Sequence, residues 1–166
     1  MEAGAGHVAG TEFQANVPFR LISNTLNGLG VIASAAFMDG EINNNTAKQA
    51  VPGLSKETYQ LTIYYERSGF EARVAARKRD KYLSETYGKS LSLVPTTDLG
   101  ATLVDAQIGY NFKDSGISSL DGLTVTLQAQ NLTDEPTVAT ETGDSRQILK
   151  YQHFGTNYLL GFSYKF

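Results

Sequence analysis

The chain ends with the stretch "NYLLGFSYKF", which runs from Asn157 to Phe166. Side chains of a β-strand point alternately to its two faces, so every second residue of this stretch shares a face. One face would carry Tyr158, Leu160, Phe162, Tyr164 and Phe166, and the other Leu159, Gly161, Ser163 and Lys165. Chain ends usually fray into polar residues, because an end that buries little apolar surface cannot offset the entropy of ordering it. The aromatic face therefore predicts a terminal strand that is held in place.

The same alternation recurs along the whole chain and predicts an all-β protein. It is clearest in "GLTVTLQAQNL", residues 122–132, where apolar and polar side chains strictly alternate. The predicted strands are seven in number and cover residues 8–18, 28–38, 57–67, 70–80, 100–112, 122–132 and 156–166. No amphipathic helix pattern interrupts them. The apolar face would include Leu61, Ile63, Val74, Val125, Leu127 and Leu160.

Strand length and loop length together favour an antiparallel, up-and-down transmembrane β-barrel. Several predicted strands reach the nine to eleven residues or so that a tilted strand needs to cross a bilayer, whereas strands of soluble proteins have about five or six. The connections alternate between short and long. The short ones are 19–27, 67–69 and 113–121, and the long ones are 39–56, 81–99 and 133–155. Short periplasmic turns and long extracellular loops alternate in this way in outer-membrane barrels.

Alternation by itself is also compatible with a soluble protein. An antiparallel sheet in a soluble domain has one apolar face, which is simply its core. The alternative is therefore a small soluble β-barrel or β-sandwich that binds an apolar ligand, as lipocalin-like barrels do. Dependence on detergent would distinguish the two interpretations.

Composition and motifs argue against several classes of function. The chain has 166 residues and a formal net charge of −3, whereas a general nucleic-acid binder is basic overall. His7 and His153 lie far apart, with no carboxylate or cysteine at ligand spacing, so no metal site is predicted. No phosphate-binding loop or nucleophile elbow is recognisable, and we expect neither a cofactor nor an enzymatic activity.

Two stretches near the end of the chain closely resemble the C-terminal end of TonB-dependent outer-membrane receptors. They are "LTVTLQAQNLTDEPTV", residues 123–138, and "HFGTNYLLGFSYKF", residues 153–166. In that family a strand that runs into an Asn-Leu-Thr-Asp turn precedes a last strand with an aromatic end. Four upstream stretches are similar to consecutive hairpins of the same barrel region: "VAGTEFQANVPF", "LNGLGVIASAAF", "VPGLSKETYQLTIYYERSGFEARVAARKRDKYL" and "TDLGATLVDAQIGYNF". The resemblance covers nearly the whole chain.

The resemblance implies that residues 1–166 are the C-terminal part of a larger receptor barrel in the outer membrane of a Gram-negative bacterium. Such receptors import a scarce nutrient, for example a siderophore, a vitamin or an oligosaccharide. The implied partners are outer-membrane lipid, the barrel-assembly machinery, the rest of the barrel with its plug, and TonB through that plug. The sequence contains no plug domain, energy-coupling box or signal peptide, so we expect a barrel segment and not a complete transporter.

The last strand also matches the assembly signal of this family, a glycine followed by two spaced aromatic residues. Gly161, Tyr164 and Phe166 occupy those positions. Leu159 stands where the family often has a polar residue. The resemblance thus implies that this strand is recognised by the barrel-assembly machinery.

The basic run "RVAARKRDK", residues 73–81, is the one concentrated charge in the sequence. Its ordinary interpretation is a solvated rim of the barrel, with Arg79 and Lys81 near an extracellular loop. The alternative places Arg73 and Arg77 on the lumen wall, where guanidinium groups would bind an anionic or hydroxylated substrate or the carboxylates of the plug. We predict Arg73 and Arg77 as substrate-binding residues on this basis.

Overall fold

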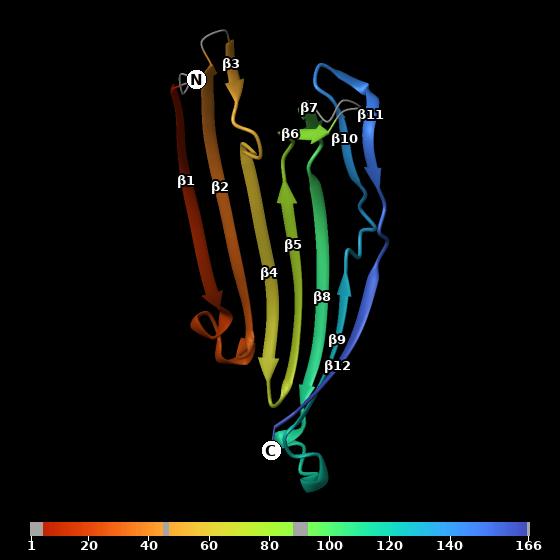
Figure 1. The fold of residues 1–166 in the computed structure, drawn as a ribbon. Coiled ribbons are helices and arrows are strands. Elements are labelled where there is room, and N and C mark those ends of the chain that lie inside the picture. Colours follow the sequence, from red (N-terminus) through yellow and green to blue (C-terminus); the bar gives the residue numbers. More distant parts are fainter. Residues whose placement is uncertain (1–4, 45–46, 88–92, 166) are drawn as a thin grey trace.

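The structure is a computed structural model that describes residues 5–44, 47–87 and 93–165. Seven long strands dominate it (Figure 1). They are β1 (Ala5–Pro18), β2 (Leu29–Asn44), β4 (Glu57–Arg67), β5 (Phe70–Arg79), β8 (Ala101–Asn111), β9 (Leu123–Gln130) and β12 (Asn157–Tyr164). They form an antiparallel sheet in the order β1-β2-β4-β5-β8-β9-β12, so each long strand pairs with the next long strand along the chain. The predicted all-β, up-and-down barrel wall is confirmed.

The short connections all lie at one end of this sheet. Residues 19–27 contain the 3-10 helices η1 (Phe19–Leu21) and η2 (Asn24–Leu26), and residues 113–121 overlap η3 (Phe112–Asp114) and contain η4 (Ser118–Leu120). Ser68 and Gly69 join β4 to β5 with positive φ angles of 51° and 79°, as a tight hairpin turn requires. No helix in the described residues is long and apolar enough to cross a membrane.

The three predicted long loops, at the other end, contain further strands that the sequence pattern did not indicate. They are β3 (Ala47–Ala50), β6 (Tyr82–Tyr87), β7 (Leu93–Asp98), β10 (Thr137–Glu141) and β11 (Asp144–Gln152). β2 also runs six residues beyond its predicted end, because residues 39–43 stay paired with β1. Four of the short strands form a second sheet in the order β11-β10-β7-β6. Register shifts on both sides of Thr140 break the regular pairing of β10 with β11.

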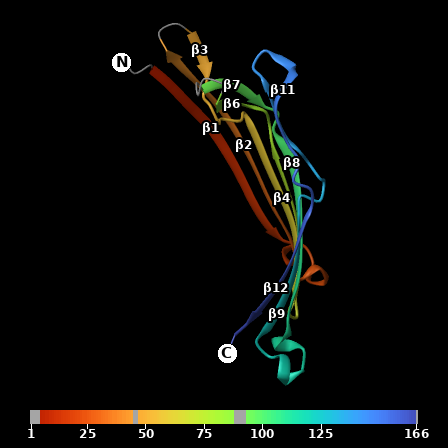
Figure 2. The same cartoon turned by 45° about the vertical axis from the view of Figure 1, so that its right-hand side comes forward.

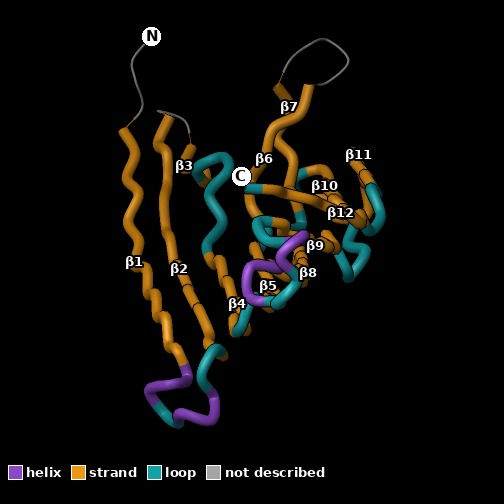
Figure 3. Tube along the Cα trace, turned by 90° about the horizontal axis from the view of Figure 1, so that it is seen from below, coloured by secondary structure: helices purple, strands orange, loops and turns teal. Residues whose placement is uncertain are grey.

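The large sheet is a single, strongly twisted layer. Figure 2 shows it nearly edge-on as one curved layer, with β1 and β12 at its two ends. In Figure 3, β1 and β2 are seen lengthwise while β5, β8 and β9 are seen nearly end-on. A right-handed twist of this kind is what a sheet needs to form part of a barrel wall. In the described residues the wall is open, because β1 pairs only with β2 and β12 only with β9.

The register of the strands separates two faces. Val31, Ile63 and Val74 are direct partners on β2, β4 and β5, and Leu127 lies between Ile108 and Leu160 on neighbouring strands. We call the side that carries these residues the apolar face. All six residues predicted for it from the alternation lie on it, since Leu61 and Val125 fall in the same alternating positions.

No side chain of this apolar face is fully buried in the part of the chain that the structure describes. Ala139, in the second sheet, is the only hydrophobic residue that is buried in the part of the chain that the structure describes. Leu61, Ile63 and Val74 are each nearly half exposed, at 45%, 48% and 49%. A sheet needs a second layer or an apolar medium against its apolar face. The interpretation in which this face is the chain's own core therefore does not fit the described residues.

The unpaired edges β1 and β12 lead to a prediction for the isolated chain. Their free backbone N–H and C=O groups can pair with strands of other molecules. We expect the chain in water without detergent to associate into oligomers or aggregates, and sedimentation velocity measures this directly. A monodisperse monomer in water would contradict the prediction and favour the soluble β-domain.

Candidate functional site

The side of the large sheet opposite the apolar face is polar. We call it the polar face. It carries Glu12, Gln14 and Asn16 of β1, Ser34 of β2, Thr58, Gln60, Thr62 and Tyr64 of β4, Glu71, Arg73, Arg77 and Arg79 of β5, Asp105 and Gln107 of β8, and Thr124, Thr126, Gln128 and Gln130 of β9. The predicted residues Arg73 and Arg77 both lie on this face.

Arg73 belongs to a ladder of hydrogen bonds across three strands. Register makes Arg73, Gln107 and Gln128 direct neighbours. Arg73 Nη2 and Gln128 Nε2 both donate to Gln107 Oε1, at 2.9 and 3.0 Å. Gln107 Nε2 in turn donates to Glu71 Oε1 at 3.1 Å. One side of the Arg73 guanidinium is thus occupied by the protein itself.

Arg77 forms an ion pair with Asp105 of the neighbouring strand β8. Its Nη2 lies 2.7 Å from Asp105 Oδ2. The other oxygen of the same carboxylate accepts a hydrogen bond from the backbone N–H of Asn131, at 3.0 Å. Arg77 therefore helps to hold the turn that follows β9, in addition to facing the polar side of the sheet.

Asn131 is the centre of that turn, which contains the "NLTD" motif. Its φ of 54° lies in the left-handed region, which Asn tolerates better than most residues. Its side chain accepts from Glu135 N at 2.9 Å and donates to the carbonyls of Glu135 and Gly155, at 3.2 and 3.3 Å. Its own carbonyl accepts from Thr156 Oγ1 at 2.9 Å. The motif therefore connects the end of β9 to the start of β12.

Arg79, the last residue of β5, joins the long connections to the sheet. Its Nε donates to Ser55 Oγ at 2.7 Å, and its Nη2 donates to the carbonyl of Gly53. The guanidinium also lies 3.7 Å from the centre of the Tyr82 ring, in a cation–π contact. The sequence predicts Arg79 near a long loop but does not predict its contact with Tyr82, because that contact depends on how β6 folds back.

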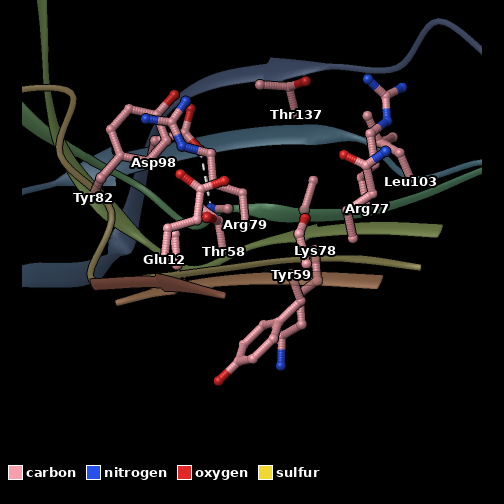
Figure 4. A pocket seen from close by; sticks show the side chains of 15 residues that line it. Glu12, Thr58, Tyr59, Arg77, Lys78, Arg79, Tyr82, Asp98, Leu103 and Thr137 are labelled. Carbon is pink, nitrogen blue, oxygen red and sulfur yellow. Dashed lines mark hydrogen bonds between the residues drawn. The ribbon is translucent and has the colours of Figure 1, made fainter. Parts of the chain in front are cut away.

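Arg77, Arg79 and Tyr82 help to line a cavity of about 500 Å³ beneath the second sheet (Figure 4). Its polar lining includes Glu12, Thr58, Arg77, Arg79, Tyr82, Asp98 and Thr137. Burial, together with the carboxylate of Asp98, raises the pKa of Tyr82 above its ordinary value, and the charge of Arg79 partly opposes this.

A second depression on the polar face, of about 290 Å³, adjoins the first. The two share Gln60 and Arg77 as lining residues. Together they present amides, hydroxyls and partly engaged guanidinium groups, which suit hydrogen bonding to a polar ligand.

In the described residues, no group of three or more His, Asp or Glu side chains is close enough together to hold a metal ion. His153, one of the two histidines, lies 2.9 Å from Asp134 and thus supports the turn.

Aromatic side chains on the apolar face form two groups with aliphatic residues between them. Phe13, Phe37 and Tyr59 lie towards the long connections, and Phe37 and Tyr59 contact edge to face at 5.9 Å. Tyr65, Phe70, Tyr110, Phe162 and Tyr164 lie towards the short connections. Tyr158, on the edge strand β12, belongs to neither group and lies between them. Tyr59 and Tyr65 are six residues apart on β4, about 20 Å at the usual rise of a strand.

The predicted assembly-signal residues lie on both faces of β12. Tyr164 lies on the apolar face opposite Leu123. Gly161 lies on the polar face opposite Thr126, where an added Cβ would come within 2.8 Å of the Thr126 hydroxyl. Phe166 lies outside the described residues.

Comparison with known proteins supports the fold. No protein-family model matches the chain, and no curated protein matches its sequence. Among solved structures, the chain is similar to the ferric citrate transporter FecA in the unliganded form, with a TM-score of 0.72 and 21% sequence identity. The similarity covers 98% of this chain and 25% of the FecA chain, so this chain spans about a quarter of the length of FecA. The similarity establishes that the chain has the fold of one part of that transporter.

The hydrogen bonds of Asn131 predict a large effect of its replacement. Asn131→Gly should lower the free energy of unfolding by about 1–3 kcal/mol, because partly buried groups lose their hydrogen bonds. Asn131→Ala should cost about 1 kcal/mol more, since alanine is strained in the left-handed region. Urea unfolding in detergent measures both values. Asn157→Ala is the control and should change stability by less than about 0.5 kcal/mol; a similar loss in all three variants would contradict the assigned role.

Proposed function

We propose that residues 1–166 form part of the barrel wall of a TonB-dependent outer-membrane receptor that imports a scarce nutrient. The observation that carries this proposal is the uncovered apolar face between two groups of aromatic side chains. Lipid is the medium that covers such a surface without a second protein layer. The likeness of the C-terminal stretches to that family and the similarity of fold to a transporter both support the proposal.

The arrangement of the apolar face fits a bilayer. Barrels of the outer membrane carry an apolar band about 25 Å tall, flanked by aromatic residues at both interfaces. Tyr59 and Tyr65 lie roughly 20 Å apart along β4, and because barrel strands tilt by about 35–45°, this separation spans about 15 Å across the membrane, within the height of such a band. Aromatic rings prefer the headgroup level, because one part of the ring is apolar and another can meet water. The strand-rich connections around β6, β7, β10 and β11 would then lie outside the cell.

The polar face would line the lumen, in contact with the plug and with the imported nutrient. Arg73 and Arg77 are proposed as part of that wall. The guanidinium N–H groups of Arg73 and Arg77 that do not donate to Gln107 or Asp105 would contact the ligand or the carboxylates of the plug. The proposed ligand is a siderophore, a vitamin or an oligosaccharide. Energy would come from TonB through the plug of the complete receptor.

Lipid exposure of Ile63 predicts opposite responses at two neighbouring positions. Ile63→Arg should lower stability in lipid vesicles by about 2–4 kcal/mol, because it places a charge near the middle of the apolar band. Thr62→Arg is the matched control, since Thr62 lies on the polar face, where an added guanidinium remains hydrated. Urea titration of both variants measures the difference. Equal tolerance of arginine at the two positions would contradict a lipid-facing apolar face.

The proposed assembly signal, Gly161, Tyr164 and Phe166, predicts a kinetic defect. Deletion of Phe166 from the full receptor should strongly reduce the amount that reaches the outer membrane, while the assembled fraction keeps nearly its normal thermal stability. Phe162→Ala removes an aromatic that is 69% exposed on the same strand and should show only the loss of its burial in lipid, about 1.5–3 kcal/mol. If both changes lower yield and stability in the same proportion, the last strand carries no recognition signal.

A further inference from the structure

The apolar face is not uniformly filled, because small residues leave a groove in it. The groove has a volume of about 660 Å³. Its floor contains Ala15, Ala33, Ala35 and Ala76, and its walls contain Phe13, Tyr59 and Leu61. Ala15 and Ala33 are direct partners, and Leu61 separates Ala33 from Ala76 in the same row. The alanines of β1, β2 and β5 thus create a hollow beside the larger side chains of β4.

Lys78 lies at the end of this groove that is nearer the long connections. Register places it between Tyr59 and Thr102, on the apolar face. Figure 4 shows Lys78 and Tyr59 extending to the opposite side of the sheet from Arg77. Lys78 is among the residues that line the polar cavity, but its side chain extends to the other side of the sheet.

The charge of Lys78 has no partner among the described residues. No carboxylate lies within ion-pair distance of its ammonium group. Two carboxylates act on the neighbouring Tyr59: that of Glu57, which accepts a hydrogen bond from the Tyr59 hydroxyl at 2.9 Å, and that of Asp80. A cation is thus held beside an apolar groove, at the level of the aromatic group.

This arrangement matches the two parts of one kind of molecule. An acyl chain would fill the alanine-floored groove and regain dispersion contacts with its lining. A phosphate at the interface would pair with the ammonium of Lys78, and the nearby Thr102 hydroxyl would donate to the same headgroup. We propose that this groove is a binding site for an anionic, phosphate-bearing membrane lipid. The inference rests on the proposed function only in requiring that the apolar face meets a membrane.

The test compares two lipids of equal chain length on the chain purified in dodecylmaltoside. Native mass spectrometry counts the bound dimyristoyl phosphatidylglycerol, which is anionic, and dimyristoyl phosphatidylcholine, which is zwitterionic. The wild type should retain phosphatidylglycerol about fivefold better, the effect of one lysine near a charged headgroup. Lys78→Gln should abolish this preference, and Lys113→Gln, which removes a positive charge at the other end of the sheet, should leave it unchanged.

A second variant tests the groove separately from the charge. Ala33→Leu fills the floor and should reduce retention of both lipids while the ratio between them stays the same. Equal retention of the two lipids by the wild type, or an unchanged ratio in Lys78→Gln, would overturn the proposal. So would a chain dimer that Ala33→Leu dissociates, because the groove would then be a contact between copies.

The outcomes also separate this inference from the proposed function. A chain that inserts into bilayers but shows no preference for the anionic lipid refutes the lipid site alone. A chain that remains a monomer in water and retains neither lipid refutes both.

Discussion

The register of the seven long antiparallel strands is the constraint on which the other features of this protein depend. Side chains alternate with a period of two, so a slip of one residue in any pairing would move apolar side chains to the polar face and polar side chains to the apolar one. The observed pairing keeps Val31, Ile63 and Val74 together on one side and Arg73, Gln107 and Gln128 together on the other. Both the apolar band and the polar ladder follow from it.

Side chains at the strand ends attach the second sheet and the turns to this wall. Arg79 reaches Gly53, Ser55 and Tyr82, which belong to two different connections. Asn131 connects β9 to β12 and is itself held by Asp105, whose other oxygen pairs with Arg77. The basic residues of β5 therefore differ in their roles according to the face they lie on. Arg77 and Arg79 bond to other segments on the polar face, whereas Lys78 lies on the opposite face.

The sheet is stable only if something covers its apolar face, and this requirement connects the fold to the proposed function. A single layer buries few of its own side chains, and the chain's one buried hydrophobic residue in the described ranges, Ala139, lies outside the large sheet. In a bilayer, lipid supplies the missing apolar contacts, and the polar face is left to line a water-filled lumen. Under the proposed function, the two faces would have separate roles, membrane anchoring and ligand contact.

The sequence by itself determined the long strands and the two faces, because alternation is a local property that each strand carries in its own residues. It also placed Arg73 and Arg77 on the polar face correctly. Only the tertiary structure decided which partners they find, since Asp105 and Gln107 lie about thirty residues away and meet them through register. The second sheet, the cation–π contact of Tyr82 and the groove beside Lys78 were likewise invisible in the sequence. The second sheet is built from short strands, two of which pair with register shifts. The groove is formed by alanines of different strands that become neighbours only when the large sheet forms.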